Sequence, residues 1–472
     1  MKIRYGLVLA MAIGLGLAGC ASGASSGGGG STAAAPSGGA GENPRNTDLT
    51  SAAQMALDAA NEATDAAEAR TWYELALGHA ESAITEDGRN PLAHRLAAMA
   101  SMGTDDYVSA DAHFDHAVAL RPLYEFDFVG IRERAWIDLY QAASPLVAAA
   151  DYEEAIVYFE NAHAIYDQRP EAMITLGQLY SQLREHDKAI ASLDAAMAFM
   201  DSDALAEADS ATIEGWREQS ADLPMLRAQV LSDAGRFEES VAAYRELSAA
   251  NPTDTEIKRG LGSILMQMGN KAEALEVYSD LMSTPGLSAA DLFSIGVGFY
   301  QASDYGNASQ AFSNAADVSV KDRDAIEMWA RSLQLDSAFA GVPDVAARWV
   351  ELDPNSQNAY LILAQATNQL EDQAATQAAI QAIDGLEVIM NDLQMQRFAA
   401  GGATVSGSLV NKTLTEGASV SVVFTFYTDD GSPMGIVTES VSAGAADMAS
   451  VFRVDFDSAE TVGGYSYELS AN

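Results

Sequence analysis

The stretch LGSILMQMGNKAEALEVY, residues 261–278, carries the pattern that decides the fold of this chain. Its small residue, Gly262, lies in a series with a fixed interval of 34 residues: Ala228, Gly262, Gly296, Ala330 and Ala364. Sixteen residues after each of these positions stand Tyr244, Tyr278, Phe312, Ala346 and Ile380, so four of the five are bulky. A small residue lets two helices approach closely, and a bulky residue of the second helix fills the space beside it. The interval therefore predicts helix pairs that bury their apolar faces by stacking on copies of themselves.

This pattern resembles the tetratricopeptide (TPR) repeat, which reads W-x2-L-G-x2-Y, then Ala, an aromatic residue and Pro. Leu261-Gly262 with Leu265 fits the first helix, and Ala274 with Tyr278 fits the second. Asn251-Pro252 fits the closing turn, because Pro cannot continue a helix. The resemblance implies a mostly α fold, an α-solenoid of stacked TPR-like helix pairs.

Nine candidate units follow from this register. They cover residues 57–90, 91–124, 136–169, 170–203, 221–254, 255–288, 289–322, 323–356 and 357–390. The register slips at 125–135 and again at 204–220. Each slip is interpreted as a lengthened connection or extra helical turn, and the alternative is an insertion that binds or docks a partner.

The N-terminus carries a second signal. Lys2 and Arg4 precede an apolar run from Leu7 to Ala18 that is too short to span a bilayer and is typical of a secretory signal. The segment Leu17-Ala18-Gly19-Cys20 resembles the lipobox of bacterial lipoproteins, which implies cleavage before Cys20 and acylation of that residue. By the same resemblance, Ala21 favours delivery to the outer membrane. The alternative is an ordinary signal peptide with an incidental cysteine.

These signals divide the chain into four parts. Residues 1–19 are predicted to be the lipoprotein signal peptide, and 20–47 the lipidated cysteine with a flexible Gly/Ser/Ala tether. Residues 48–395 are predicted to be the solenoid, and 400–472 a small antiparallel β-sandwich. Cys20 is the chain's one cysteine, so an internal disulfide framework and a cysteine-ligated metal are excluded.

The C-terminal part alternates apolar and polar residues and contains turn residues between five expected strands. These strands are expected at 405–410, 419–427, 435–441, 449–456 and 465–469. The segment resembles the FxLYD-type bacterial immunoglobulin-like modules, on Gly407, Val410-Asn411, Phe426-Tyr427, Asp430-Gly431 and Phe452. That resemblance implies an accessory module without catalysis.

The amino-acid composition of the chain restricts the classes of molecule that it can bind. With 26 basic and 67 acidic residues the chain has a formal net charge of −41, which disfavours nucleic acid and anionic lipid surfaces. Solvated helix faces explain such acidity; a marine or halophilic source, or a basic partner, are the alternatives.

Motifs for chemistry are missing from the sequence: there is no phosphate loop, no G-x-S-x-G and no H-E-x-x-H. His113 and His116 stand three apart on an expected helix, a spacing that metal ligands use, but they flank Phe114 and are interpreted as exposed polar residues. We therefore expect no enzymatic activity, no metal and no cofactor.

The solenoid itself suggests the function. The TPR resemblance implies a groove lined by the first helix of each unit, and it assigns six groove candidates: Arg259, Met266, Phe293, Tyr300, Arg331 and Gln365. Such aromatic and polar side chains would suit a peptide or a partner helix, unless they pack against the next unit instead. The sequence predicts a lipid-anchored scaffold that faces the periplasm, in an assembly or export process. The alternative is a structural spacer or surface-exposed lipoprotein with no groove ligand.

Overall fold

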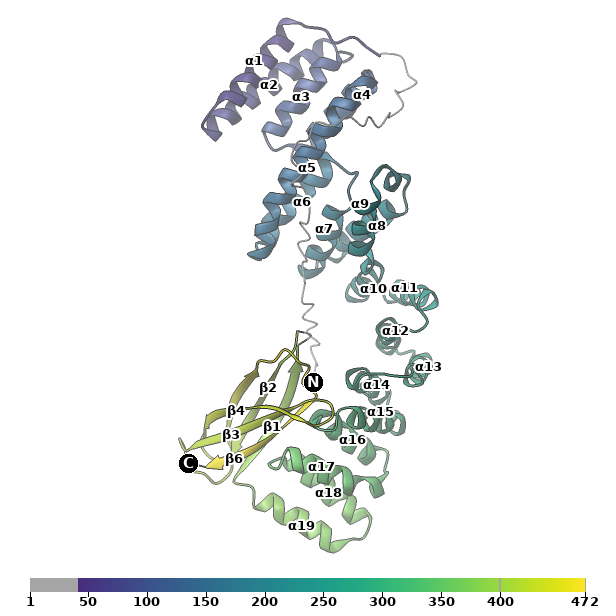
Figure 1. The fold of residues 1–472 in the computed structure, drawn as a ribbon, viewed down its shortest axis with the longest axis vertical. Helices are drawn as coiled ribbons and strands as arrows, with labels where there is room; N and C mark the ends of the chain where they lie inside the picture. The colour runs from purple at the N-terminus through teal and green to yellow at the C-terminus, as the bar shows by residue number, and fades with distance from the viewer. Residues whose placement is uncertain (1–40, 399, 472) are drawn as a thin grey trace. The chain divides into compact units, whose positions relative to one another are not determined.

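The computed structural model describes residues 41–398 and 400–471, and the chain divides into two compact units after Ala135 (Figure 1). The predicted signal peptide, Cys20 and most of the predicted tether lie outside the described residues. The first unit contains α1 (Asp48–Glu62), α2 (Ala66–Glu86), α3 (Pro91–Gly103), α4 (Tyr107–Leu120) and the short η1 (Pro122–Tyr124). Helix α5 (Glu125–Ala148) begins in this unit and ends in the second.

The second unit continues with helices and ends with strands. Its helices are α6 (Tyr152–Ile165), α7 (Glu171–Gln182), α8 (His186–Met200), η2 (Asp203–Glu207), α9 (Ser210–Ser220), α10 (Leu223–Asp233), α11 (Phe237–Ala250), α12 (Thr255–Gln267), α13 (Lys271–Met282), α14 (Ala289–Gln301), α15 (Tyr305–Val318), α16 (Arg323–Leu335), η3 (Phe339–Gly341), α17 (Val342–Leu352), α18 (Gln357–Gln369) and α19 (Gln373–Asp384). The predicted fold class, helix pairs followed by a small antiparallel β module, is confirmed.

The close approach expected at the small residues is present. A Cβ on Gly262 of α12 would lie 2.7 Å from the ring of Tyr278 on α13, and a Cβ on Gly298 of α14 would lie 2.4 Å from the same ring. The Tyr278 ring is thus held between the first helices of two successive pairs. Gly296 stands in the same relation to Phe312, at 2.7 Å. Tyr278 and Phe312 therefore pack against the small residue of their own pair, as the 16-residue spacing predicts, and Tyr278 also packs against the next pair.

A second feature with the same period fixes where the first helices begin. Asp254, Ser288, Asp322 and Ser356 are the N-caps of α12, α14, α16 and α18, and their side chains accept hydrogen bonds from backbone N–H groups of the first turn. Such a cap stabilises a helix by about 1 kcal/mol. The repeat is therefore marked by its helix starts as well as by its core.

The two slips in register have different structural results. The residues at 125–135 lengthen a helix, because α5 runs unbroken for 24 residues from Glu125. The residues at 204–220 form part of η2 and the extra helix α9, whose Trp216 is buried and packs edge-on against Phe199 at 5.5 Å. In both insertions the extra residues therefore mainly form helix.

The start of the first unit differs from the expectation. The expected first repeat begins at residue 57, whereas α1 begins at Asp48, behind a capping box formed by Thr47 and Thr50. Residues 41–47, expected to belong to the flexible tether, are bonded to the folded unit: the Glu42 N–H donates to the Leu120 carbonyl, and Arg45 forms an ion pair with Asp87 at 2.6 Å. The expected tether therefore ends before residue 41.

The β module is a sandwich of two three-stranded antiparallel sheets, ordered β1-β2-β5 and β4-β3-β6. Its strands are β1 (Val388–Arg397), β2 (Ala403–Asn411), β3 (Ser419–Tyr427), β4 (Pro433–Ser442), β5 (Ala449–Phe456) and β6 (Gly464–Ala471). Five correspond to the expected strands. The first, β1, was missed: the predicted solenoid boundary at 395 is wrong, because the last helix ends at Asp384 and the module begins at Val388.

One apolar core fills the sandwich and draws on both sheets. Phe424 and Phe426 of β3 are fully buried there, and Phe424 lies 5.8 Å from Phe452 of the opposite sheet. The expectation that these aromatic residues form core, and not a ligand site, is correct.

Candidate functional site

The six groove candidates lie on consecutive first helices. Arg259 and Met266 are on α12, Phe293 and Tyr300 on α14, Arg331 on α16 and Gln365 on α18. We call the face that carries these six residues together with Leu361 of α18 the first-helix face. Leu361 was missed as a candidate, although it stands two repeats after Phe293 in the same register.

Two of the apolar candidates are packing residues. Phe293 is half-buried, contacts the two core clusters on either side of α14, and packs edge-on against Phe312 at 5.3 Å. Met266 is also half-buried against the core. Of the two alternatives for the groove candidates, packing against neighbouring repeats therefore applies to Phe293 and Met266.

The polar candidates tie neighbouring first helices together. Arg259 of α12 lies 3.6 Å from the Asp291 carboxylate of α14. Gln334 of α16 donates a hydrogen bond to Gln365 of α18. Burial raises the pKa of Tyr300, and the positive charge of Arg331 on the next first helix opposes that rise. The first contact joins α12 to α14, and the second joins α16 to α18.

Leu361 is an exposed apolar side chain on the first-helix face. Its side chain is 47% exposed, although it lies in the middle of α18. On the second helix of the same pair, Ile380 of α19 is also 47% exposed. The two residues have similar size and equal exposure on opposite helices of one pair.

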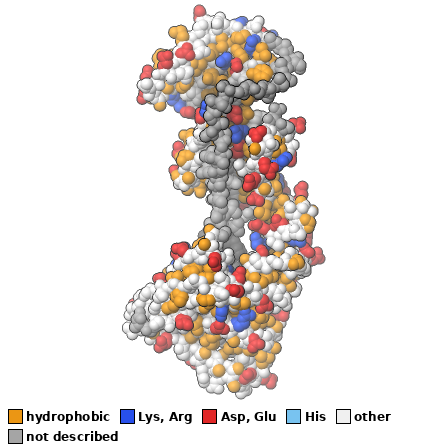
Figure 2. Space-filling view, in the orientation of Figure 1, with side chains coloured by type: hydrophobic (Ala, Val, Ile, Leu, Met, Phe, Trp, Pro, Cys, Tyr) orange, Lys and Arg blue, Asp and Glu red, His pale blue; other side chains and the backbone are white. Residues whose placement is uncertain are grey.

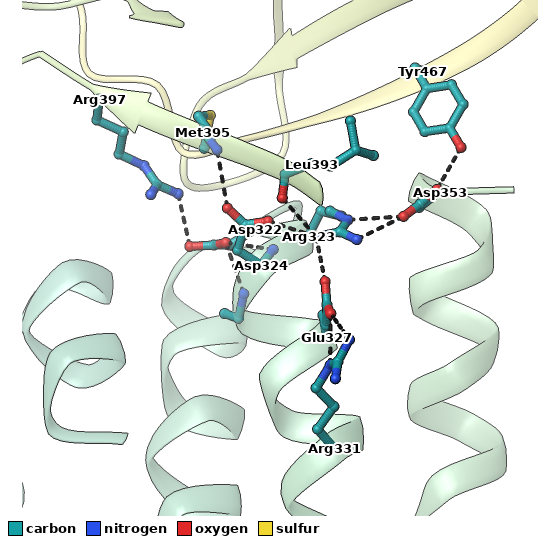
Figure 3. A network of polar contacts seen from close by, with 11 residues as sticks. Asp322, Arg323, Asp324, Glu327, Arg331, Asp353, Leu393, Met395, Arg397 and Tyr467 are labelled. Carbon is teal, nitrogen blue, oxygen red and sulfur yellow. Dashed lines mark hydrogen bonds and ion pairs between the residues drawn. The ribbon is translucent and has the colours of Figure 1, made fainter. Parts of the chain in front are cut away.

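A different polar network joins the β module to the solenoid, and sequence reasoning missed it (Figure 3). Arg323, the first residue of α16, is 6% exposed and donates to the Asp353 carboxylate at 2.9 and 3.1 Å. Asp353 follows α17 and also accepts a hydrogen bond from the Tyr467 hydroxyl of β6. Burial raises the pKa of Asp353, and the Arg323 guanidinium opposes that rise.

The same guanidinium has further partners. Its Nη1 lies 2.9 Å from the Asp324 carboxylate and donates to the Leu393 carbonyl of β1 at 3.4 Å. The buried Arg323 of the solenoid is thus linked to two strands of the β module, to β1 directly and to β6 through Asp353. A buried charge with this many partners is costly to leave unpaired.

Asp322 makes the next contact of this interface. One of its carboxylate oxygens caps α16, and the other forms an ion pair with Arg397 of β1 at 2.8 Å. Arg397 also donates to the carbonyls of Val462 and Gly463, at 2.8 and 2.7 Å. The Asp322 side chain therefore both caps α16 and attaches the β module.

Backbone contacts complete the attachment at two successive turns between repeats. At the first turn, the Val320 N–H donates to the Asp429 carbonyl, and the Tyr465 N–H donates to the Lys321 carbonyl. A Cβ on Gly464 would lie 1.9 Å from that Lys321 oxygen, so only glycine fits there. At the second turn, the Met390 N–H donates to the Asn355 carbonyl.

Three histidines of the first unit, His94, His113 and His116, come together in a way the sequence did not indicate. His94 of α3 is buried, and its Nδ1 lies 3.4 Å from the Nδ1 of His113 on α4. The His116 ring stacks on His94, with ring centroids 5.3 Å apart. His113 is half-buried, so the expectation of an exposed side chain holds for His116 but is wrong for His113.

Within 41–398 and 400–471, no group of three or more His, Cys, Asp or Glu side chains is arranged to hold a metal ion. No described helix has both the length and the apolar character needed to cross a membrane. Figure 2 shows Asp and Glu side chains scattered over the visible face, as expected for solvated helices.

Comparison with known proteins gives one family match, over part of the chain. The model of the bacterial transcriptional activator domain matches residues 168–285, which hold α7 to α13. No curated protein matches the chain.

Solved structures of TPR proteins are similar to this chain at low identity. The C-terminal part of a TPR repeat-containing protein from Cytophaga hutchinsonii is 17% identical, with a TM-score of 0.40, over 52% of this chain and 95% of that one. PilF of Pseudomonas aeruginosa is 17% identical, with a TM-score of 0.33, over 53% and 98%. YrrB, described as a TPR protein with an unusual peptide-binding site, is 17% identical, with a TM-score of 0.29, over 40% and 91%.

Proposed function

We propose that this chain is a lipid-anchored scaffold of the bacterial cell envelope that holds a protein or peptide partner along its first-helix face. The partner would be held near the membrane by the acylated Cys20, on the periplasmic side of the outer membrane. An assembly or export process is the setting in which such a tethered, non-catalytic scaffold is useful.

The observation that carries this proposal is the set of contacts between neighbouring first helices. Arg259 with Asp291 links α12 to α14, and Gln334 with Gln365 links α16 to α18 on the same face. A binding surface whose side chains are already fixed loses less conformational entropy when a partner binds. Leu361 and Tyr300 give this face the apolar contact that helix and peptide partners use.

The acidity of the chain supports a protein partner over a nucleic acid. At a net charge of −41, DNA phosphates would be repelled at ordinary salt. A DNA-bound role of the kind suggested by the name of the matching family is therefore disfavoured. A partner that presents basic residues would be attracted by the net negative charge of the chain, and an apolar residue of that partner would meet Leu361 on the face.

The test is affinity capture of the full-length protein, crosslinked in its native envelope and read by mass spectrometry. Leu361→Glu places a charge on the first-helix face, and Ile380→Glu is the matched control, because both side chains are 47% exposed in the same helix pair. We expect one dominant partner with the wild type and with Ile380→Glu, and its loss with Leu361→Glu. Equal capture by both variants would show that the partner does not use this face.

The alternative function is a structural spacer or surface-exposed lipoprotein without a groove ligand. Capture of no enriched partner by the wild type would favour it. Cleavage of the β module by protease added to whole cells would further place the protein on the cell surface.

A further inference from the structure

Three imidazoles meet between α3 and α4 of the first unit, and no proposed role of the chain uses them. His94 comes from α3, and His113 and His116 come from α4. His94 is 6% exposed, so its ring is fixed by the surrounding core. The site lies in a different unit from the first-helix face and is independent of it.

Backbone carbonyls settle which nitrogen of two rings carries the proton. The His94 Nε2 lies 3.2 Å from the Gly88 carbonyl, which can only accept, so Nε2 is protonated and Nδ1 presents a lone pair. The His116 Nδ1 lies 2.7 Å from the Ala112 carbonyl, so this ring presents its lone pair at Nε2. A second hydrogen bond of this kind is the usual support of a metal-binding histidine.

The distance between the two facing nitrogens suits a shared ion. A zinc–nitrogen bond is about 2.0–2.1 Å long, so two ligands at the tetrahedral angle lie about 3.4 Å apart. The Nδ1 atoms of His94 and His113 are 3.4 Å apart. A hydrogen bond is the other contact that these two nitrogens can make, and 3.4 Å is at the long end for one.

We propose that His94 and His113 bind one divalent transition metal ion of the zinc type through their Nδ1 atoms. The protein supplies two ligands, and water or another small ligand completes the coordination. Imidazole nitrogens favour zinc, nickel and copper over magnesium and calcium. Burial lowers the pKa of both His94 and His113, which leaves the rings neutral and able to coordinate at neutral pH.

The test uses Co²⁺ as the probe, because tetrahedral Co²⁺ absorbs visible light far more strongly than the octahedral ion that surface carboxylates hold. The full chain is titrated with Co²⁺ in excess Mg²⁺, beside His113→Gln and the control His79→Gln. His79 lies on α2 of the same unit, so His79→Gln also removes one imidazole. We expect one tetrahedral Co²⁺ for the wild type and for His79→Gln, displaced by Zn²⁺, and at least a tenfold loss of affinity in His113→Gln.

Three results would overturn the proposal: an octahedral spectrum only, displacement of Co²⁺ by Mg²⁺, or unchanged binding by His113→Gln. A second measurement does not depend on how the variants fold. In protein labelled with ¹⁵N at histidine, Zn²⁺ should shift the Nδ1 resonances of two rings and leave those of His163 and His186 unchanged. Absence of any Nδ1 shift would likewise reject the site.

Discussion

Arg323 and Arg331, about two turns apart on α16, bind the two oxygens of one carboxylate, that of Glu327. Arg323 Nη1 lies 2.5 Å from Oε2, and Arg331 Nη2 lies 2.6 Å from Oε1. Arg323 belongs to the interface with the β module, and Arg331 belongs to the first-helix face (Figure 3). Glu327 therefore connects the attachment of the module to the surface proposed to bind a partner.

Glu327→Gln should destabilise the second unit. The substitution keeps the shape of the side chain but removes a charge from beside Arg323, which retains Asp353 and Asp324. We expect a loss of about 1–3 kcal/mol in the free energy of unfolding, measured in urea. Arg331→Gln is the control, because Arg331 is more exposed and its loss should cost about 0.5 kcal/mol or less. Equal effects of the two variants would contradict the assigned role of Glu327.

Asp353→Asn should weaken the attachment of the β module. Asparagine keeps an oxygen that can accept from Tyr467, but it removes the carboxylate that accepts two hydrogen bonds from the buried Arg323. Removing one partner of a buried ion pair costs about 3–5 kcal/mol. We expect limited proteolysis to release the module from Asp353→Asn and not from Asp344→Asn, an exposed position on α17. Resistance of both variants to protease would show that the ion pair is dispensable for docking.

Gly464→Ala should displace β6 from the solenoid. The added Cβ would lie 1.9 Å from the Lys321 carbonyl oxygen. Neither atom can move away unless the backbone that carries it also moves. A drop in the thermal midpoint is expected, with loss of the Tyr465 to Lys321 hydrogen bond visible as faster amide exchange. Gly215→Ala on α9 is the opposite case, because nothing lies within 4 Å of its added Cβ and a helical glycine is less stable than alanine by about 0.5–1 kcal/mol. That variant should be at least as stable as the wild type.

The second unit should lose stability on acidification through His163. Burial lowers the pKa of His163 below its ordinary 6.5, and its Nδ1 has no hydrogen-bond partner among the residues that the structure describes. Below pH 6.5 the unfolded chain takes up a proton that the folded histidine resists, so the free energy of unfolding falls as the pH falls. Urea unfolding between pH 7.5 and 5 should show a smaller decline for His163→Gln than for the wild type. Parallel declines would mean that other groups cause the acid sensitivity.

Cys20→Ala should release the chain from the membrane. The lipobox resemblance implies that this cysteine alone carries the acyl chains, and several acyl chains anchor firmly. In cells fed labelled palmitate, the wild type should incorporate the label and sediment with membranes, whereas Cys20→Ala should do neither. Labelling of the variant would remove lipid anchoring from the proposed function.

Local periodic signals explain most of what the sequence predicts. Gly262 and Tyr278 are 16 residues apart within one helix pair, so the core of the solenoid can be inferred from spacing alone. The N-caps at Asp254, Ser288, Asp322 and Ser356 have the same period and could have been found in the same way. Strand β1 was missed because its sequence, VIMNDLQMQR, is rich in residues that also favour helices.

Contacts between distant residues could not be predicted in this way. Arg323 meets Asp353 and Leu393, and Asp353 meets Tyr467, at separations that no local period describes. The half-buried state of Phe293 depends on how closely successive pairs stack, which the helix pattern alone does not specify. His94 and His113 are joined by the packing of α3 on α4, and their separation of nineteen positions gave no signal.

The two attachment turns of the β module have a mechanical consequence. If the module were attached at residues 319–322 alone, it could rotate about one axis relative to the solenoid. The second attachment, at 353–355, prevents that rotation. The module and the last repeats therefore move as one rigid body. A force applied to the sandwich would therefore bend the solenoid at these two neighbouring turns. The curvature of the stacked repeats would change as a result.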